Sequence, residues 1–288
     1  MQRAVAAMNS VANQTDASSQ TGWQLDNLAV GVPGGDTLVQ LHARIAPGRV
    51  TAIVGPNGAG KSSLLSTITG QWRPHAGQVL LDGQPLAAWP AEQLATRRAM
   101  MMQDGAVAFD FTVQEVVELG RYAHRLRPSR DEAGIIAAAM AATDITAFAQ
   151  RSVRTLSGGE RARTHLARVL AQLWEPAGEH ARWLLLDEPT AAMDLAWQHH
   201  TMALLQRWAH QSGANQGTNV GVITVVHDMN LALRYADDVL LVHAGGCQHG
   251  PVAEVLTPST IASVWGIGCH ATHTPDGVAQ YLFAGHAN

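Results

Sequence analysis

The sequence has little of several features that mark whole classes of protein. Its two cysteines, Cys247 and Cys269, do not make the disulfide framework of a small secreted protein. No stretch approaches the roughly 18 consecutive apolar residues that cross a bilayer, and the longest, at 134–142, is about half that. Nor is there an excess of basic residues, because 19 Lys and Arg face 23 Asp and Glu. The formal net charge of −4 disfavours a general nucleic-acid binder. We therefore expect a cytosolic globular protein with no membrane span.

The length and composition of the chain are typical of a folded globular protein. The 288 residues include 47% hydrophobic and 15% charged residues, enough for a well-buried core in one large domain or two small ones. Residues 1–20 are polar and contain no apolar core of signal-peptide length, so we interpret residues 1–22 as a disordered lead-in.

Short apolar runs alternate with segments of helical spacing along the chain. We expect buried strands at 50–54, 183–186, 220–226 and 239–242, and helices at 61–71, 158–173, 195–209 and 229–235. Hairpin strands are expected at 23–32 with 37–45, and before the Asp82-Gly83 turn, while 92–149 reads as mostly helical and 212–219 as a polar loop. Strands that alternate with helices predict an α/β fold with a largely parallel sheet.

A glycine-rich loop follows the first buried strand. Its residues match the phosphate-loop pattern G-x-x-x-x-G-K-[ST] and are Gly55, Pro56, Asn57, Gly58, Ala59, Gly60, Lys61 and Ser62, with Ser63 next. The glycines let the backbone curl around phosphates, and the N-terminus of the following helix adds positive potential. Lys61 would place a charge near the β and γ phosphates, and Ser62 would offer a hydroxyl to Mg²⁺. The alternative is a plain strand–helix turn, which the Lys and Ser make improbable.

Two acids end the apolar run at 183–186. An acid at the end of a buried strand costs desolvation energy unless it meets a cation. In a phosphate-loop fold that cation is Mg²⁺, which Asp187 would hold directly or through water. Glu188 would then polarise an attacking water as a general base. A surface Asp-Glu-Pro turn is the alternative reading of these residues.

The sequence Leu156-Ser157-Gly158-Gly159-Glu160 stands 30 residues before the paired acids and opens a helix. With this motif the chain resembles the ATP-binding subunits of ABC transporters, over about residues 23–265. The resemblance implies a P-loop NTPase fold of the ABC type, with an antiparallel β subdomain and a helical subdomain at about 104–165, followed by a tail at 266–288. It also implies that Ser157, Gly158, Gly159 and Glu160 face the nucleotide of a partner subunit in a homodimer with two ATP molecules. Glu160 stands where the family usually has Gln.

Further site residues follow from this resemblance alone. Gln103 matches the glutamine that links Mg²⁺ and the attacking water to the transmembrane partner, and 104–111 is then the segment that docks on the permease. Asp194 matches the loop that contacts the partner ATPase subunit, and His227 matches the histidine beside the γ-phosphate. The family often has an aromatic residue near Val32 that stacks on adenine. Here it is absent, so that stacking is weaker or comes from Trp23 or another group.

Three stretches resemble the importers of iron chelates, haem and vitamin B12, and within that group the hemin-import subunits. They lie at 109–121, at 227–237 and at 250–258. The resemblance implies ATP and Mg²⁺ as ligands, two transmembrane permease subunits, a periplasmic substrate-binding protein, and a peripheral position on the cytoplasmic face of the inner membrane. A siderophore or vitamin B12 cargo, a soluble ABC ATPase and a small-molecule kinase stay open as alternatives. Scattered histidines and the Cys269-His270 pair read as ordinary surface residues rather than as a haem or metal site.

Overall fold

The structure, a computed structural model, describes residues 21–102, 110–175, 180–215 and 219–284, without the side chains of 211–215. The strands are β1 (Trp23–Gly31), β2 (Thr37–Ile45), β3 (Val50–Val54), β4 (Ala76–Leu81), β5 (Gln84–Pro85), β6 (Arg98–Met101), β7 (Arg182–Leu186), β8 (Val220–Val225), β9 (Asp238–His243), β10 (Gly246–Pro251), β11 (Cys269–His273) and β12 (Ala279–Phe283). The α-helices are α2 (Lys61–Ile68), α3 (Ala91–Arg97), α4 (Val113–Leu119), α5 (Glu132–Ala142), α6 (Gly158–Gln172), α7 (Leu195–Asn215), α8 (Met229–Tyr235), α9 (Val252–Val255) and α10 (Pro258–Trp265). Short 3₁₀ turns are η1 (Leu86–Ala88), η2 (Gly120–His124), η3 (Thr146–Phe148) and η4 (Val153–Thr155).

A six-stranded sheet forms the centre of the molecule, in the order β10-β9-β3-β8-β7-β6. Strands β9, β3, β8, β7 and β6 pair in parallel, and only β10 at the edge runs antiparallel. Every residue of β3, β7 and β8 is buried, as expected for strands covered on both faces, which read as continuous apolar runs. The α/β fold with a mostly parallel core sheet is therefore confirmed.

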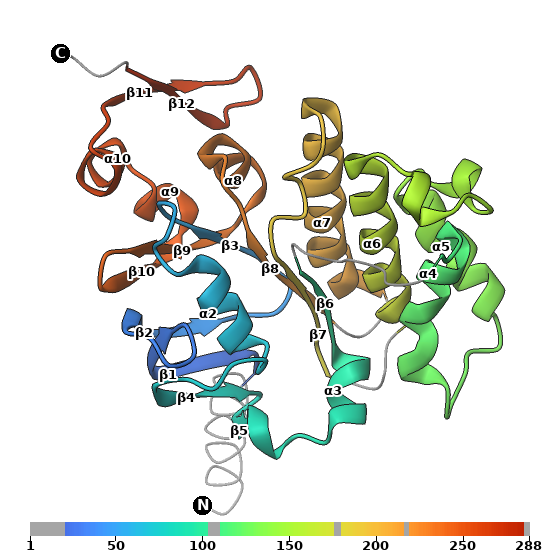
Figure 1. Cartoon of the computed structure of the whole chain (residues 1–288). Helices are drawn as coiled ribbons and strands as arrows, with labels where there is room; N and C mark the ends of the chain where they lie inside the picture. Colours follow the sequence, from blue (N-terminus) through green and yellow to red (C-terminus); the bar gives the residue numbers. More distant parts are fainter. Residues whose placement is uncertain (1–20, 103–109, 176–179, 216–218, 285–288) are drawn as a thin grey trace, which may run out of the picture.

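Alternate residues of these strands enter two separate hydrophobic cores. On one face, Leu184 and Leu186 of β7 pack with side chains from α4, α5, α6, α7 and α8. On the other face, Trp183 and Leu185 pack with α2 and the antiparallel sheet. Helices α2 and α6 therefore lie on opposite faces of the sheet, and Figure 1 shows them on opposite sides of the molecule.

The antiparallel sheet has the order β2-β1-β4-β5. Trp23 of β1 is fully buried and meets Trp183 edge-on, with ring centroids 5.9 Å apart. Gly221 makes room for the Trp183 ring, because a Cβ at that glycine would lie 2.2 Å from it. Two indole rings thus join the antiparallel sheet to the central one.

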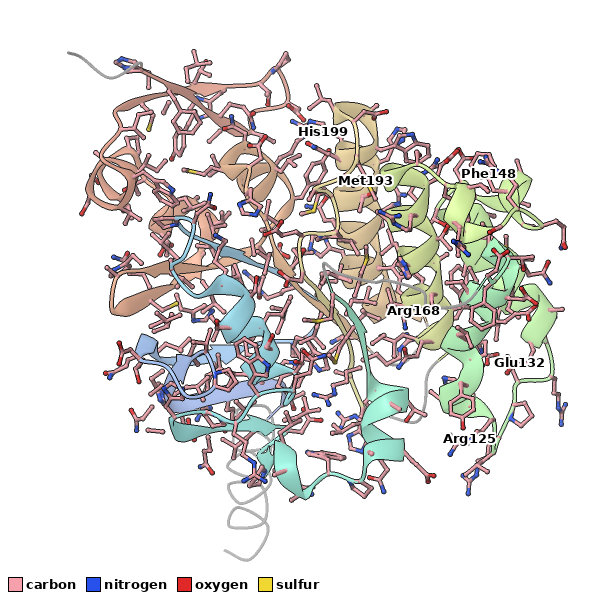
Figure 2. The ribbon with its side chains drawn as sticks, in the orientation of Figure 1. Arg125, Glu132, Phe148, Arg168, Met193 and His199 are labelled. Atoms are coloured by element: carbon pink, nitrogen blue, oxygen red, sulfur yellow. The ribbon has the colours of Figure 1, made fainter. Side chains whose placement is uncertain are left out.

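Helices α4, α5 and α6 form a separate group to the right of the sheet in Figure 1. Arg168 of α6 donates to the Met100 carbonyl oxygen at 3.0 Å and so ties this group to β6 (Figure 2). Arg121 bridges the group internally, since its Nε donates to Glu132 at 2.7 Å. Within the described parts of the chain, none of the helices has the length and apolar character that a membrane crossing needs.

Three local expectations from the sequence were wrong. Residues 98–101 are strand β6 and not part of a helix, because Ala99 and Met101 are buried beside β7. Helix α7 continues to Asn215, so 212–215 is helical where a polar loop was expected. The helix after the phosphate loop ends at Ile68 instead of near 71, and Gly70 there has the left-handed φ of 71°.

The C-terminal segment contains a β-hairpin, for which the sequence predicted no element. Strands β11 and β12 pair along their length, and β12 packs against α8 (Figure 1). The side chain of Asn230 donates to the Tyr281 carbonyl oxygen at 3.2 Å and accepts from its N–H at 2.7 Å. The Tyr281 hydroxyl donates to the Leu256 carbonyl oxygen at 2.5 Å. The hairpin is thus fastened to the helix that follows His227.

Removing the Tyr281 ring tests how much this hairpin contributes. Tyr281 is 6% exposed, so Tyr281→Ala should lower the free energy of unfolding by about 3 kcal/mol, as for other buried aromatic side chains. Tyr281→Phe keeps the ring and should cost only about 1 kcal/mol for the lost hydrogen bond. Urea unfolding compares both with the wild type. Equal midpoints for the Ala variant and the wild type would mean that the hairpin contributes nothing to stability.

Candidate active site

Three loops that the sequence singled out meet at one edge of the central sheet. The ends of β3, β7 and β8 are in register, since Ile53 pairs with Val225 and Leu186 with Thr224. Because these strands are parallel and adjacent, the segments after them emerge side by side at the carboxyl edge. That edge therefore carries the phosphate loop, the paired acids and His227.

The phosphate loop is held in shape by its glycines. Gly55 lies against β9, where a Cβ would come within 2.1 Å of the Val242 carbonyl oxygen. Gly58 and Gly60 have φ values of 78° and 101°, which L side chains rarely adopt. Gly60 also caps α2, whose first N–H groups are left without partners inside the helix. The loop therefore ends on a helix N-terminus with the polarity that attracts anions.

Lys61 is the only lysine in the chain and is 6% exposed. Its Nζ donates to the carbonyl oxygens of Gly55 and Pro56 at 2.9 and 3.0 Å. Burial lowers the pKa of the ammonium group, while the charges of Glu188 and Asp187 oppose that shift. The cation is thus already inside the loop, in reach of an anion that the loop would bind.

Ser62 and Asp187 face each other across the start of α2 and the end of β7. The Ser62 hydroxyl donates to Asp187 Oδ1 at 3.3 Å. Asp187 is 3% exposed, and burial raises the pKa of its carboxyl group even though the Ser62 hydrogen bond lowers it. Its N–H continues the sheet by donating to the Met101 carbonyl oxygen at 2.8 Å. The Ser62 hydroxyl and the Asp187 carboxylate thus place two oxygen donors side by side next to the phosphate loop.

Glu188 and His227 form a close pair at the same edge. Their nearest atoms, Glu188 Oε1 and His227 Nε2, are 2.5 Å apart, and the side chains are 13% and 47% exposed respectively. Glu188 has a φ of 50°, a left-handed conformation that is strained for any residue but glycine. Such strain persists only where the surrounding structure enforces it, and strained residues cluster at functional sites.

The signature residues 157–160 lie at the start of α6, which packs on the opposite face of the central sheet from α2. Ser157 caps α6 through a reciprocal pair of hydrogen bonds, in which its Oγ accepts from the Glu160 N–H at 3.3 Å. Glu160 accepts from the Ser157 N–H at 2.7 Å, and this bond lowers the pKa of its carboxyl group. The glycines Gly158 and Gly159 press on Ala192, which is within 3.2 Å of where either Cβ would stand.

A shallow hollow of about 410 Å³ lies between this turn and the loop before α7. It is lined by Ser157, Gly158, Gly159, Glu160, Arg163, Ala192, Met193, Asp194 and Trp197. Met193 and His199 mark this end of α7 in Figure 2. Since α2 and α6 lie on opposite faces of the sheet, the hollow is not part of the chain's own phosphate loop.

The structure assigns simpler contacts to some of the predicted residues. Asp194 caps α7, its Oδ1 accepting from the Trp197 N–H at 2.9 Å. The suggestion that Trp23 stacks on adenine is wrong, because its side chain is fully buried in the core against Trp183. Val32, in the turn after β1, is 45% exposed. Gln103 and most of the predicted docking segment, up to residue 109, lie outside the described residues.

Sequence reasoning missed two side chains beside the hollow, Arg163 and Trp197. The Arg163 guanidinium carbon lies 3.9 Å from the centroid of the Trp197 ring. Arg163 is three residues before buried Leu166 on α6, so a cation stands on the apolar face of that helix. A cationic residue at a core-facing position of a helix is the sequence signal that could have indicated a specific contact for the Arg163 side chain.

Comparison with known proteins identifies the family of this chain. The family model described as ABC transporter matches residues 38–191. The hemin import ATP-binding protein HmuV of Pseudomonas putida is 43% identical over 245 residues, 85% of this chain and 92% of that protein. The protein of the same name from Gloeobacter violaceus is 45% identical over 243 residues, 83% and 86% of the two chains. The chain belongs to the ABC transporter family, and it is an ATPase of that family.

Among solved structures, the fold is similar to a metal-chelate type ABC transporter in an inward-facing conformation. The TM-score is 0.74 at 24% sequence identity, and the alignment covers 92% of this chain and 98% of that one. The predicted ABC-type P-loop NTPase fold is therefore confirmed.

Proposed function

We propose that this chain is the energy-coupling ATPase subunit of an importer whose cargo is hemin. The cargo is supported by the two hemin import proteins, which are 43% and 45% identical over most of their length. The hydrolytic role is supported by the meeting of Lys61, Asp187, Glu188 and His227 at one sheet edge. In the assembly we propose, two copies sit on the cytoplasmic face of the inner membrane with two permease subunits, which receive hemin from a periplasmic binding protein.

Phosphate binding would fall to the loop 55–62 and to Ser63 after it. The Lys61 ammonium would exchange its two carbonyl partners for the β and γ phosphate oxygens, which carry full charge and bind it more strongly. The N-terminus of α2 would add its positive potential to the same phosphates.

Asp187 and Ser62 fit a Mg²⁺ site. A buried carboxylate with a raised pKa is relieved by a nearby cation, and both side chains offer the oxygen donors that Mg²⁺ prefers. Gln103 would join them, as the resemblance implies. When bound, the ion would neutralise charge on the β and γ phosphates.

Glu188 is the general base in this proposal. Its carboxylate would take a proton from water as the water oxygen attacks the γ-phosphorus, and ADP would leave as the bond to the β-phosphate oxygen breaks. His227, 2.5 Å from that carboxylate, would orient it and hold the γ-phosphate and water. The left-handed backbone at Glu188 supports a functional role, because such strain clusters at active sites.

The signature turn would complete the site of a second copy. It presents Ser157, Gly158 and Gly159 at the N-terminus of α6, on a face away from the chain's own loop. A homodimer that pairs each turn with the other copy's ATP satisfies both halves of the site. Asp194 would lie in that dimer contact, next to the hollow.

Reconstitution with candidate permeases tests this function. The chain and a hemin permease in lipid vesicles, with hemin-loaded binding protein inside, should hydrolyse ATP faster than the chain alone. Stimulation only by the permeases for ferric siderophores or vitamin B12 would show that the cargo is one of these compounds and not hemin. No permease association would favour a soluble ATPase, and a phosphorylated small molecule in place of free phosphate would indicate a kinase.

A further inference from the structure

Arg163 and Trp197 connect the two loops that line the hollow. Arg163 lies on α6, one helical turn after the signature residues, and Trp197 lies on α7, one turn after Asp194. The guanidinium carbon is 3.9 Å from the centroid of the indole ring, within the range of a cation–π contact. Arg163 is 8% exposed, so water screens this contact little.

The guanidinium is fixed from a third direction. Its Nη1 donates to the carbonyl oxygens of Asp144 and Thr143, at 2.8 and 3.3 Å, just after α5 ends. Asp144 turns the chain there with a left-handed φ of 51°. Because these hydrogen bonds fix the guanidinium group, its position over the indole ring is well defined.

Trp197 is hydrogen-bonded to the loop before α7, whereas Arg163 follows the signature turn on helix α6 itself. The backbone N–H of Trp197 donates to Asp194 Oδ1 at 2.9 Å, and this bond ties Trp197 to the loop before α7. On the other side, Glu160 stands three residues before Arg163 and holds the Ser157 N–H at 2.7 Å. The ring contact is therefore joined to one wall of the hollow by the Trp197–Asp194 hydrogen bond and to the other wall by helix α6 itself.

We propose that Arg163 and Trp197 are positioning residues that hold the signature turn and the 191–194 loop in fixed register. The two walls then meet the nucleotide of the second copy as one surface. This inference rests on the proposed function, in which the signature turn serves the partner's ATP. It assigns neither side chain a contact with ATP.

Trp197→Ala is the direct test, made in the Glu188→Gln background so that bound ATP persists. Dimer formation by sedimentation in Mg·ATP should weaken by about tenfold, because without the cation–π contact the two walls must be ordered at the moment the second copy binds. ATP affinity of the dilute monomer, measured by calorimetry, should stay unchanged, because the phosphate loop is untouched. With Glu188 intact, the KM for ATP should rise while kcat changes less.

Two further variants separate positioning from general packing. Trp197→Phe keeps an aromatic face for Arg163 and should restore most of the dimer affinity. Trp208→Ala is the matched control, because Trp208 lies farther along α7 and packs on Trp174, which follows α6, with ring centroids 5.2 Å apart. It should lower thermal stability without changing dimerisation.

The outcomes distinguish the inference from the function on which it rests. Wild-type dimer affinity in Trp197→Ala, or equal losses in Trp197→Ala and Trp208→Ala, would overturn the positioning role alone. No ATP-dependent dimer in the Glu188→Gln parent would overturn the proposed two-copy site, and the positioning role with it.

Discussion

Replacing Glu188 by Gln should reduce steady-state ATP hydrolysis by about 100-fold or more while ATP still binds. The amide has the size of the carboxylate and can still accept a hydrogen bond from His227, whose Nε2 lies 2.5 Å from Oε1. It cannot take the proton of the attacking water. Phosphate release measures turnover, and calorimetry with Mg·ATP measures binding.

The control for this variant is Glu254→Gln, the same change at an exposed carboxylate on α9. It removes one charge far from the sheet edge and should hydrolyse ATP at the wild-type rate. Turnover near the wild-type rate in Glu188→Gln would remove Glu188 from the role of base. Loss of ATP binding in that variant would point instead to a damaged site.

Lys61→Ala should weaken ATP binding by about 10- to 100-fold, the loss expected for one charge-assisted hydrogen bond. The side chain is buried inside the loop and bonded to two of its carbonyl oxygens, so the Ala variant also leaves Gly55 and Pro56 without this donor. Calorimetry with Mg·ATP and with Mg·ADP gives the affinities.

Lys61→Met separates these two effects, because it keeps the length of the side chain without its charge. Equal losses in the Met and Ala variants would assign the effect to the charge. A smaller loss in Lys61→Met would show that filling the loop matters as well. Unchanged ATP affinity in both variants would refute phosphate binding by Lys61.

The central strands could be predicted from the sequence because burial on both faces restricts which residues they can contain. Strands β3, β7 and β8 are buried on both faces, so they must read as apolar runs, and the loops after them carry the conspicuous residues. The carboxyl-edge site then follows from parallel pairing. The direct contact between Glu188 and His227 required the structure, because it joins side chains that follow two different strands, β7 and β8.

Elements that depend on tertiary contacts could not be read from the sequence. Arg98–Met101 contains residues that favour helices, and it is a strand because β7 offers it a partner. The hairpin β11–β12 is mostly exposed and so lacks an apolar pattern. The contact between Arg163 and Trp197 joins residues 34 positions apart, which no local pattern encodes.

The single lysine gives the chain an unusual chemical property. Reagents that acylate amines have one side-chain target in the whole sequence, and it lies inside the phosphate loop. If Lys61 binds phosphate as proposed, nucleotide should slow its acylation, since a bound phosphate would shield the only amine besides the chain terminus. Coupling a dye, a resin or a crosslinker to the lysine side chain should therefore inactivate the protein, because that side chain lies in the proposed ATP site. Probes for this protein belong on Cys269 or an introduced cysteine, because burial raises the pKa of the Cys247 thiol to about 12 and so lowers its reactivity.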